Sequence, residues 1–316
     1  MKKLYRDLCI TLALMPTAFL STLANARVRN GFATLGTANI HYGVYDSETE
    51  SQGDVLYIHG FGDRFENHVA LFDSFNRAGL RVIAFDLPSH GYSSGAAGDD
   101  LNKQTFDKLV TIASQVLSLN RGADDQKPLI LAGWSLGGLL ATRIAQDEKY
   151  QLQFPKLSGL ILYAPSLAPK PCVGNLFCQI SNATLTHNEL LQDSEIKPKS
   201  PLNYLAFDTR LVLAAAKAWR ASFPSELSTL VFLADSNDRY VFSEKIVDWV
   251  KLQRANYISH IPAYSCKGAR HELDNETTEF GGAFVRDISA EFANLMVRGE
   301  HWEGKLSSHT APCQAF

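Results

Sequence analysis

The stretch PLILAGWSLGG, residues 128–138, decides the fold of this chain. Its first six residues form an apolar run of strand length, and helical periodicity begins after Ser135. Between the two lies G-x-S-x-G, in the strand–turn–helix context in which a serine hydroxyl projects from a strained turn. Glycines are needed there because the turn packs closely against neighbouring backbone. We therefore predict that Ser135 is a nucleophile at the carboxyl end of a buried strand.

The same alternation of short apolar runs and helical stretches extends along the chain. The predicted strands are Asp54–His59, Leu80–Phe85, Pro128–Gly133, Gly159–Tyr163, Thr229–Ala234 and Tyr257–Tyr264. The predicted helices between them are Val69–Arg77, Phe106–Leu119 and Leu136–Gln146. Continuous apolar runs are typical of strands that are buried on both faces of a parallel sheet. The pattern predicts an α/β fold with a mostly parallel central sheet flanked by helices.

One region interrupts this rhythm. Between Ser166 and Phe223 the chain contains four prolines, two close cysteines and one strong helical stretch at Thr209–Arg220, but no buried-strand run. We interpret this region as a helical cap inserted over the carboxyl edge of the sheet, where α/β enzymes place their ligand sites. The expected organisation is a core of residues 27–165, a cap or lid of residues 166–224, and a second core part of residues 225–316 with a C-terminal tail.

A serine nucleophile needs a base and an acid that orients it. Asp238 lies in the loop that leaves the strand Thr229–Ala234, and we prefer it to Asp235, which can brace the turn instead. His271 follows in a glycine-containing loop after the last predicted strand. The order serine, acid, histidine is that of hydrolases with this motif, so we expect a triad of Ser135, Asp238 and His271.

The reaction also needs donors for an oxyanion. The strand ending at Ile58 opens into the glycine-flanked turn HGFG, residues 59–62. We assign the donors to the backbone N–H groups of Phe61 and Leu136, the latter being the residue after the nucleophile. His59 is expected to be structural, because the catalytic histidine comes last in the chain order.

Four motifs together resemble one known family. They are HGFG at 59–62, FDLPSHGYS at 85–93, GWSLGG at 133–138 and GARHEL at 268–273. This combination resembles the lysophospholipase and monoacylglycerol lipase branch of the α/β hydrolases. The resemblance implies the α/β-hydrolase fold and structural roles for Asp86, His90 and Ser93. The chain departs from the branch at Trp134 and Leu136, where the family commonly has histidine and methionine.

The resemblance implies hydrolysis of a carboxylic ester through an acyl-enzyme, with no metal or organic cofactor. The implied substrate is a small-molecule or lipid ester such as a lysophospholipid or monoacylglycerol, and a transient contact with a membrane surface stays open. No protein partner can be inferred. Apolar side chains of the insertion could form a lid over an acyl chain or simply pack a helix on the sheet. They are Leu205, Phe207, Leu211, Leu213 and Trp219.

Two other functions use the same scaffold. A serine aminopeptidase related to prolyl aminopeptidases would need a carboxylate for the substrate α-amine, and Glu189, Glu195 or Glu226 could supply it. A non-catalytic binding protein would have a broken triad, whereas all the parts are present here.

Composition and the N-terminus point to an exported globular protein. The chain has 316 residues, a net charge of -3 and a sequence pI near 6.3, so no broad positive field favours nucleic acid as a partner. A basic start, an apolar run and Ala24-Asn25-Ala26 predict a signal peptide of residues 1–26, cleaved after Ala26. We therefore expect a periplasmic or secreted protein.

Cysteine usage agrees with that compartment. Cys172, Cys178, Cys266 and Cys313 remain after cleavage, and an even number in an exported chain favours disulfides. The close spacing of Cys172 and Cys178 favours pairing them, which leaves Cys266 to pair with Cys313. Neither pair has the spacing and histidine partners typical of zinc.

Overall fold

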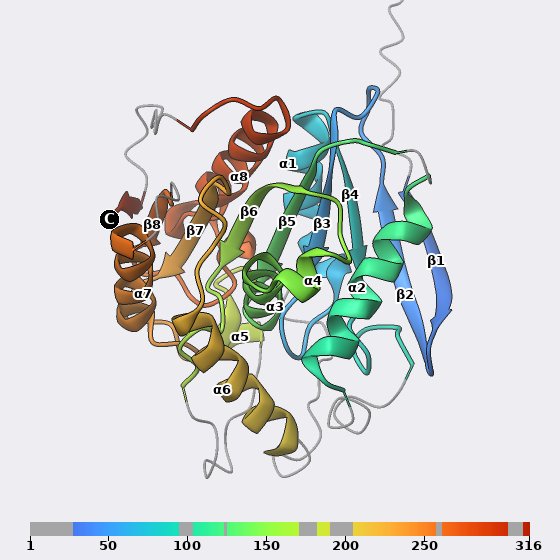
Figure 1. The fold of residues 1–316 in the computed structure, drawn as a ribbon. Helices are drawn as coiled ribbons and strands as arrows, with labels where there is room; N and C mark the ends of the chain where they lie inside the picture. The colour runs from blue at the N-terminus through green and yellow to red at the C-terminus, as the bar shows by residue number, and fades with distance from the viewer. Residues whose placement is uncertain are drawn as a thin grey trace, which may run out of the picture.

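A nine-stranded sheet runs through the described part of the chain (Figure 1). The computed structural model describes residues 28–94, 104–122, 125–170, 182–189, 205–256, 261–302 and 312–316. The strands are β1 (Val28–Leu35), β2 (Ala38–Tyr45), β3 (Gly53–Ile58), β4 (Leu80–Phe85), β5 (Leu129–Trp134), β6 (Leu157–Tyr163), β7 (Thr229–Ala234), β8 (Ala263–Cys266) and β9 (Cys313–Ala315). The helices are α1 (Val69–Arg77), α2 (Phe106–Asn120), α3 (Leu136–Gln146), α4 (Glu148–Gln151), α5 (Asn182–Leu185), α6 (Leu205–Arg220), α7 (Ser243–Asn256) and α8 (Gly282–Val297).

The strands are ordered β1-β2-β4-β3-β5-β6-β7-β8-β9. From β4 to β8 all pairs are parallel, and only the outer pairs β1–β2, β2–β4 and β8–β9 are antiparallel. Every residue of β3, β5 and β7 is buried, which explains their continuous apolar sequences. Because parallel strands end at the same edge, the loops after β3, β5, β6, β7 and β8 meet there.

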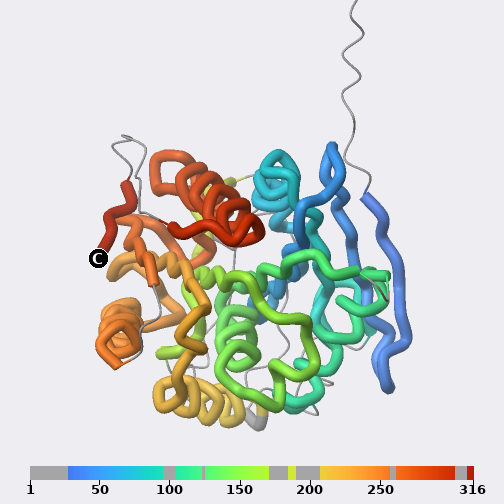
Figure 2. Tube along the Cα trace, turned by 45° about the horizontal axis from the view of Figure 1, so that its top comes forward, coloured from blue at the N-terminus to red at the C-terminus, as the bar shows by residue number. Residues whose placement is uncertain are grey.

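Helices cover both faces of the sheet. α1 and α8 lie together on one face, and α2, α3 and α7 lie on the other (Figures 1 and 2). α1 buries Leu71, Phe72 and Phe75 on its sheet side, at the spacing of an amphipathic helix. The predicted α/β architecture, a mostly parallel central sheet flanked by helices, is confirmed by this layering.

Most predicted elements are confirmed. The helix Val69–Arg77 and the strands Leu80–Phe85 and Thr229–Ala234 have the predicted bounds. Of the predicted strand Tyr257–Tyr264, residues 257–260 lie outside the described residues; the rest is wrong in its bounds, because β8 spans Ala263–Cys266. Pro262, which has no N–H for the ladder, comes immediately before it. The hairpin β1–β2 and the short β9 were not predicted.

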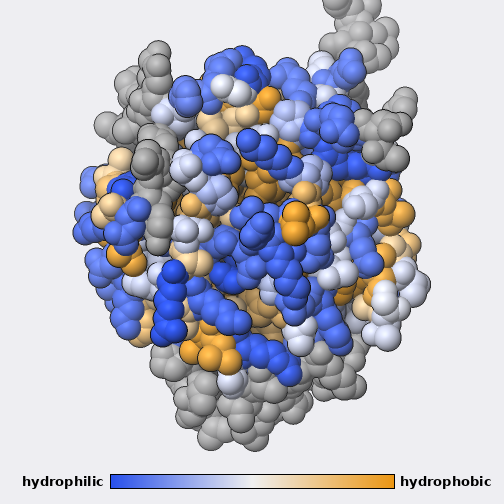
Figure 3. Space-filling model, viewed as in Figure 1, coloured by the Kyte–Doolittle hydropathy of each residue, from blue (hydrophilic) through white to orange (hydrophobic). Residues whose placement is uncertain are grey.

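Residues 166–224 contribute α5 and α6, and no strand of the sheet among their described residues. Phe207 of α6 is buried, and the Trp219 indole donates a hydrogen bond to the Leu167 carbonyl at 2.7 Å. Leu213 faces solvent and is 58% exposed. Hydrophobic side chains over this helix form one of several hydrophobic patches on a face where hydrophilic side chains also gather (Figure 3). The apolar stripe of α6 is thus divided between the core and the surface.

The termini are only partly described. Cys266 and Cys313 form a disulfide, which attaches the last strand to β8. The predicted pair Cys172–Cys178 and the predicted signal peptide lie outside the described residues. Among the helices that the structure describes, none combines the length and the apolar character that crossing a membrane requires.

Candidate active site

Ser135 stands at the sharp turn between β5 and α3. Its backbone has φ 52° and ψ −113°, a strained conformation for a residue with a side chain. A Cβ atom on Gly133 would lie 2.4 Å from the Gly137 carbonyl oxygen, and one on Gly137 would lie 2.0 Å from that of Ile58. Neither contact is tolerable, so both glycines of the motif are required for the turn. The turn places the hydroxyl at the carboxyl edge of the sheet.

Three side chains from three loops meet at this turn. The Nε2 atom of His271 lies 2.8 Å from Ser135 Oγ, and its Nδ1 atom lies 2.8 Å from Asp238 Oδ2. Ser135 is 8% exposed, and the other two are also buried. The sequence-predicted serine, histidine and aspartate are therefore brought together in one hydrogen-bonded chain, although Ser135 and His271 are 136 residues apart.

The carboxylate of Asp238 is held in its ionised form. Burial alone would raise the pKa of Asp238, but His271 and the backbone N–H groups of Tyr240 and Val241 lower it below its ordinary value. Those two N–H groups donate to Oδ1 at 2.8 and 3.0 Å. Asp235, the alternative acid, instead accepts from the backbone N–H groups of Asn237 and Gly268, at 2.9 Å each. Asp235 braces its loop, and Asp238 contacts the histidine.

The HGFG turn packs directly against the nucleophile. A Cβ on Gly60 would lie 3.1 Å from Ser135 Cβ and 2.5 Å from the Trp134 ring. A side chain at position 60 would therefore collide with the nucleophile turn. Leu136 is the first residue of α3, where N–H groups have no partner within the helix. These positions place the main chain of residues 60–61 and 136 around Ser135, as expected for an oxyanion site.

His59 joins this turn to the next strand end. The Leu87 N–H donates to His59 Nε2 at 2.8 Å, so the proton is on Nδ1, which donates to the Gly60 carbonyl at 2.7 Å. Burial lowers the pKa of His59, which keeps the ring neutral for both bonds. His59 therefore acts as a structural brace in this arrangement.

The FDLPSHGYS loop is held by Asp86. The carboxylate accepts hydrogen bonds from the backbone N–H groups of Phe65 and Tyr92, and it lies 2.8 Å from His41 Nδ1. The Ser93 hydroxyl donates to the Asp86 carbonyl at 2.7 Å. His90 bonds to the carbonyl of Pro88, also within the loop. These contacts hold the loop to β2 and to the segment that follows the HGFG turn.

Two residues at the site had no assigned role in the sequence. The Trp134 indole donates to the backbone carbonyl of His271 at 2.9 Å and lies between the rings of His68 and His271. The Ser166 hydroxyl lies 3.2 Å from Ser135 Oγ. Trp134 was visible only as a departure from the family pattern, and nothing in the sequence marks Ser166.

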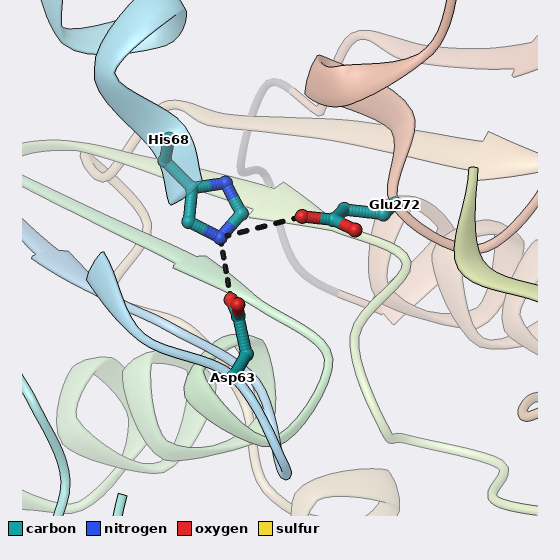
Figure 4. Close-up of side chains that lie close together, drawn as sticks. All are labelled: Asp63, His68 and Glu272. Carbon is teal, nitrogen blue, oxygen red and sulfur yellow. Dashed lines mark hydrogen bonds and ion pairs between the residues drawn. The ribbon is translucent and has the colours of Figure 1, made fainter. Parts of the chain in front are cut away.

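A second cluster of buried polar residues includes Asp63, His68 and Glu272 (Figure 4). His68 Nε2 lies 2.6 Å from Asp63 Oδ2, and His68 Nδ1 lies 2.6 Å from Asp274 Oδ2. Glu272, the residue after His271, approaches the same Nε2 at 3.8 Å. The cluster connects the loop of the HGFG turn to the loop of His271, across 206 residues of sequence. No sequence motif predicts this cluster.

The distances in this cluster fit a protonated histidine held between carboxylates. Asp63, His68 and Glu272 offer donor atoms within 4.8 Å of one another, a set that a divalent cation could use. Both ring nitrogens of His68 lie 2.6 Å from a carboxylate oxygen, and charge-assisted hydrogen bonds are the short ones. Burial lowers the pKa of His68, but Asp274 and Asp63 outweigh it and raise the pKa well above 6.5. Burial also raises the pKa of Glu272, which favours its neutral form.

Replacing His68 by leucine is expected to lower the free energy of unfolding by about 3–5 kcal/mol, because it leaves Asp63 and Asp274 buried without their cation. The pKa of His68 is raised on folding, so its stabilisation is complete below about pH 6.5 and declines as the pH rises through the raised value. Urea unfolding at several pH values measures both effects.

Exposed His301 provides the matched control for His68. His301→Leu should unfold at nearly the same urea concentration as the wild type. Equal stability of His68→Leu and His301→Leu would show that the cluster contributes nothing to the fold.

Two of the three carboxylates considered for an α-amine lie in the part of the chain that the structure describes. Glu226 precedes β7 and therefore lies at the amino edge of the sheet, opposite to Ser135. Glu189 is exposed just after α5, and Glu195 lies outside the described residues. A separate cavity of about 300 Å³ lies between α2, α3 and α6, and none of its lining residues belongs to the triad.

The doubly wound sheet, the strained serine turn and the hydrogen-bonded serine–histidine–aspartate chain define an α/β hydrolase. A family model described as "Serine aminopeptidase, S33" matches residues 49–217, more than half of the chain, and the chain belongs to this family.

Among curated proteins, the chain is 28% identical over 151 residues to the "Monoacylglycerol lipase" of Mycolicibacterium smegmatis, covering 46% of this chain and 49% of that protein. The chain spans about half the length of the curated relatives it matches first. The structure of a soluble variant of monoglyceride lipase from Saccharomyces cerevisiae superposes with a TM-score of 0.67 at 14% identity, over 89% of this chain and 99% of that one. The monoacylglycerol lipase of Paleococcus ferrophilus gives 0.63 at 19% identity, over 81% and 99%. The resemblance to this branch is thereby confirmed.

Proposed function

We propose that this protein is a serine hydrolase that cleaves the carboxylic ester of a single-chain lipid, such as a monoacylglycerol or a lysophospholipid, through an acyl-enzyme. The observation that carries the proposal is the chain of two 2.8 Å contacts from Ser135 through His271 to Asp238. It begins at a nucleophile held in a strained turn. Relatives named as lipases support the choice of an ester over a peptide substrate.

The geometry suits acyl transfer. His271 takes the Ser135 proton as the Ser135 oxygen attacks the ester carbonyl, and Asp238 stabilises the imidazolium that results. The N–H groups of Phe61 and Leu136 hold the tetrahedral oxyanion, aided by the N-terminus of α3. His271 then protonates the leaving alcohol. Water, activated by the same histidine, releases the fatty acid from Ser135.

The surroundings of the nucleophile favour an apolar acyl group. The Phe61 ring stacks on that of Phe207 from α6, with centroids 6.1 Å apart, and it also contacts the His90 ring. Phe207 is one of the apolar residues of the proposed cap, so this helix reaches the oxyanion turn. Glu226, one of the carboxylates considered for a free α-amine, precedes β7 and lies at the opposite edge of the sheet from Ser135.

The test combines a covalent probe with a substrate panel. A fluorophosphonate should label the wild-type protein on Ser135, located by peptide mass spectrometry. Purified enzyme should release fatty acid from monoacylglycerols or lysophospholipids faster than it releases naphthylamine from aminoacyl-naphthylamides. Hydrolysis of the naphthylamides but not of the esters would replace the proposal by the aminopeptidase alternative. An unlabelled protein without either activity would contradict catalysis altogether.

We further propose that the mature protein is exported, with cleavage after Ala26. The Cys266–Cys313 disulfide supports this compartment, because such bonds persist outside the reducing cytosol. N-terminal sequencing of the protein from the periplasm or medium tests it, and a start at Arg27 is expected.

A further inference from the structure

Ser166 is the one hydroxyl, among the described side chains, that forms a hydrogen bond with the nucleophile. Its Oγ lies 3.2 Å from Ser135 Oγ, and the residue is only 6% exposed. It follows β6, the strand next to β5 in the sheet, at the edge where the triad assembles. The mechanism described above does not use it.

The backbone places this hydroxyl, so the contact does not depend on a mobile side chain. The Ser135 N–H donates to the Tyr163 carbonyl and the Ser166 N–H donates to the Ser135 carbonyl, both at 2.9 Å. Between them, Ala164 has a positive φ of 38°, an unfavourable conformation for a residue with a Cβ. A Cβ on Gly138 would lie 2.9 Å from Pro165, so this segment packs against the first turn of α3. The segment 163–166 is therefore locked to the nucleophile turn.

The available protons determine the direction of the bond. Asp238 accepts the Nδ1 proton of His271, so the neutral ring can only accept at Nε2, and the Ser135 hydroxyl donates there. Ser135 has a single proton. The Ser166 hydroxyl is therefore the donor in the 3.2 Å hydrogen bond, and Ser135 Oγ is the acceptor.

We propose that Ser166 is a further catalytic residue, which donates a hydrogen bond to Ser135 Oγ while that oxygen carries partial negative charge; the proposal rests on the proposed function. In acylation the Oγ–carbon bond forms as the Ser135 proton moves to His271. In deacylation a water molecule gives a proton to His271 as its oxygen attaches to the carbonyl carbon. The Oγ–carbon bond then breaks, and His271 passes the proton to Oγ. Ser166 keeps its own proton in both steps. A bond to a charged oxygen is stronger than one to a hydroxyl, so it favours the transition states over the resting enzyme.

Kinetics of Ser166→Ala test the role. The expected kcat for a p-nitrophenyl ester is about 10- to 100-fold lower, with KM within about twofold of wild type, because the lost bond is strong only in the transition state. The rate of fluorophosphonate labelling of Ser135 should fall by a similar factor. A purely structural role would change thermal unfolding and leave the labelling rate of the folded enzyme intact.

The pair Ser166→Thr and Ser166→Val separates the hydroxyl from its volume. These side chains have nearly the same shape, and only threonine keeps the donor. Threonine should stay within about threefold of wild type, while valine should lose as much as alanine. Equal rates for both, or full activity of Ser166→Ala, would overturn the inference. A wild-type enzyme that neither binds the probe nor cleaves esters would instead refute the proposed function.

Discussion

Replacing Ser135 by alanine should lower kcat for a carboxylic ester about 10⁶-fold, the scale on which removal of a triad nucleophile acts. The substitution removes Ser135 Oγ, the atom that the strained turn and the triad contacts position for attack, so no acyl-enzyme can form. Steady-state hydrolysis of a p-nitrophenyl ester measures the loss, and the fluorophosphonate should no longer label the protein. The oxyanion donors remain and leave a small residual rate.

Ser225, an exposed serine that precedes β7, supplies the control. Ser225→Ala should retain the wild-type rate, and both variants should unfold at similar temperatures. Hydrolysis by Ser135→Ala at the wild-type rate would mean that another residue is the nucleophile.

Changing Asp238 to asparagine should lower kcat about 10⁴-fold. Only the oxygen of the amide can accept the hydrogen bond from His271 Nδ1. The amide can instead present its NH₂ group to the ring, which stabilises the wrong tautomer of the histidine. It also removes the negative charge that stabilises the imidazolium. The low pKa of Asp238 means that the wild-type carboxylate is ionised throughout the neutral range, so this loss should persist from pH 6 to 8. Steady-state kinetics over that range measure it.

Asp235 offers a matched control in the same loop. Its two oxygens accept only backbone N–H groups, and an asparagine keeps one of these acceptors. Asp235→Asn should therefore stay within a few-fold of the wild-type rate. A larger loss of rate for Asp235→Asn than for Asp238→Asn would show that Asp235, and not Asp238, is the acid that orients His271.

The strands that the sequence predicted well are the ones buried on both faces. β3, β5 and β7 have apolar sequences from end to end because helices cover both sides of the sheet. β1 is largely exposed, so no apolar run marks it, and it is ordered through pairing with β2. The prediction of the last strand included Ile261 and Pro262, which lie before β8, because the apolar pattern continues through Pro262, a residue that cannot donate to the ladder.

The candidate site divides in the same way. The motif around Ser135 and the order of Ser135, Asp238 and His271 along the chain are local features that can be read directly. Which of two aspartates reaches the histidine depends on the path of a loop. The loop after β7 directs Asp235 toward backbone N–H groups and Asp238 toward the ring.

The sequence by itself determined the α/β class, the nucleophile turn and the candidate residues, because burial on two faces and a strained glycine-flanked turn require particular residue types at adjacent positions. Only the tertiary structure decided the neighbours of those residues. Ser166 reaches Ser135 because β5 and β6 are adjacent strands, and His68 meets Asp274 because two distant loops close over the same edge. Contacts between segments 31 and 206 residues apart follow from strand order and loop packing, and neither has a local pattern.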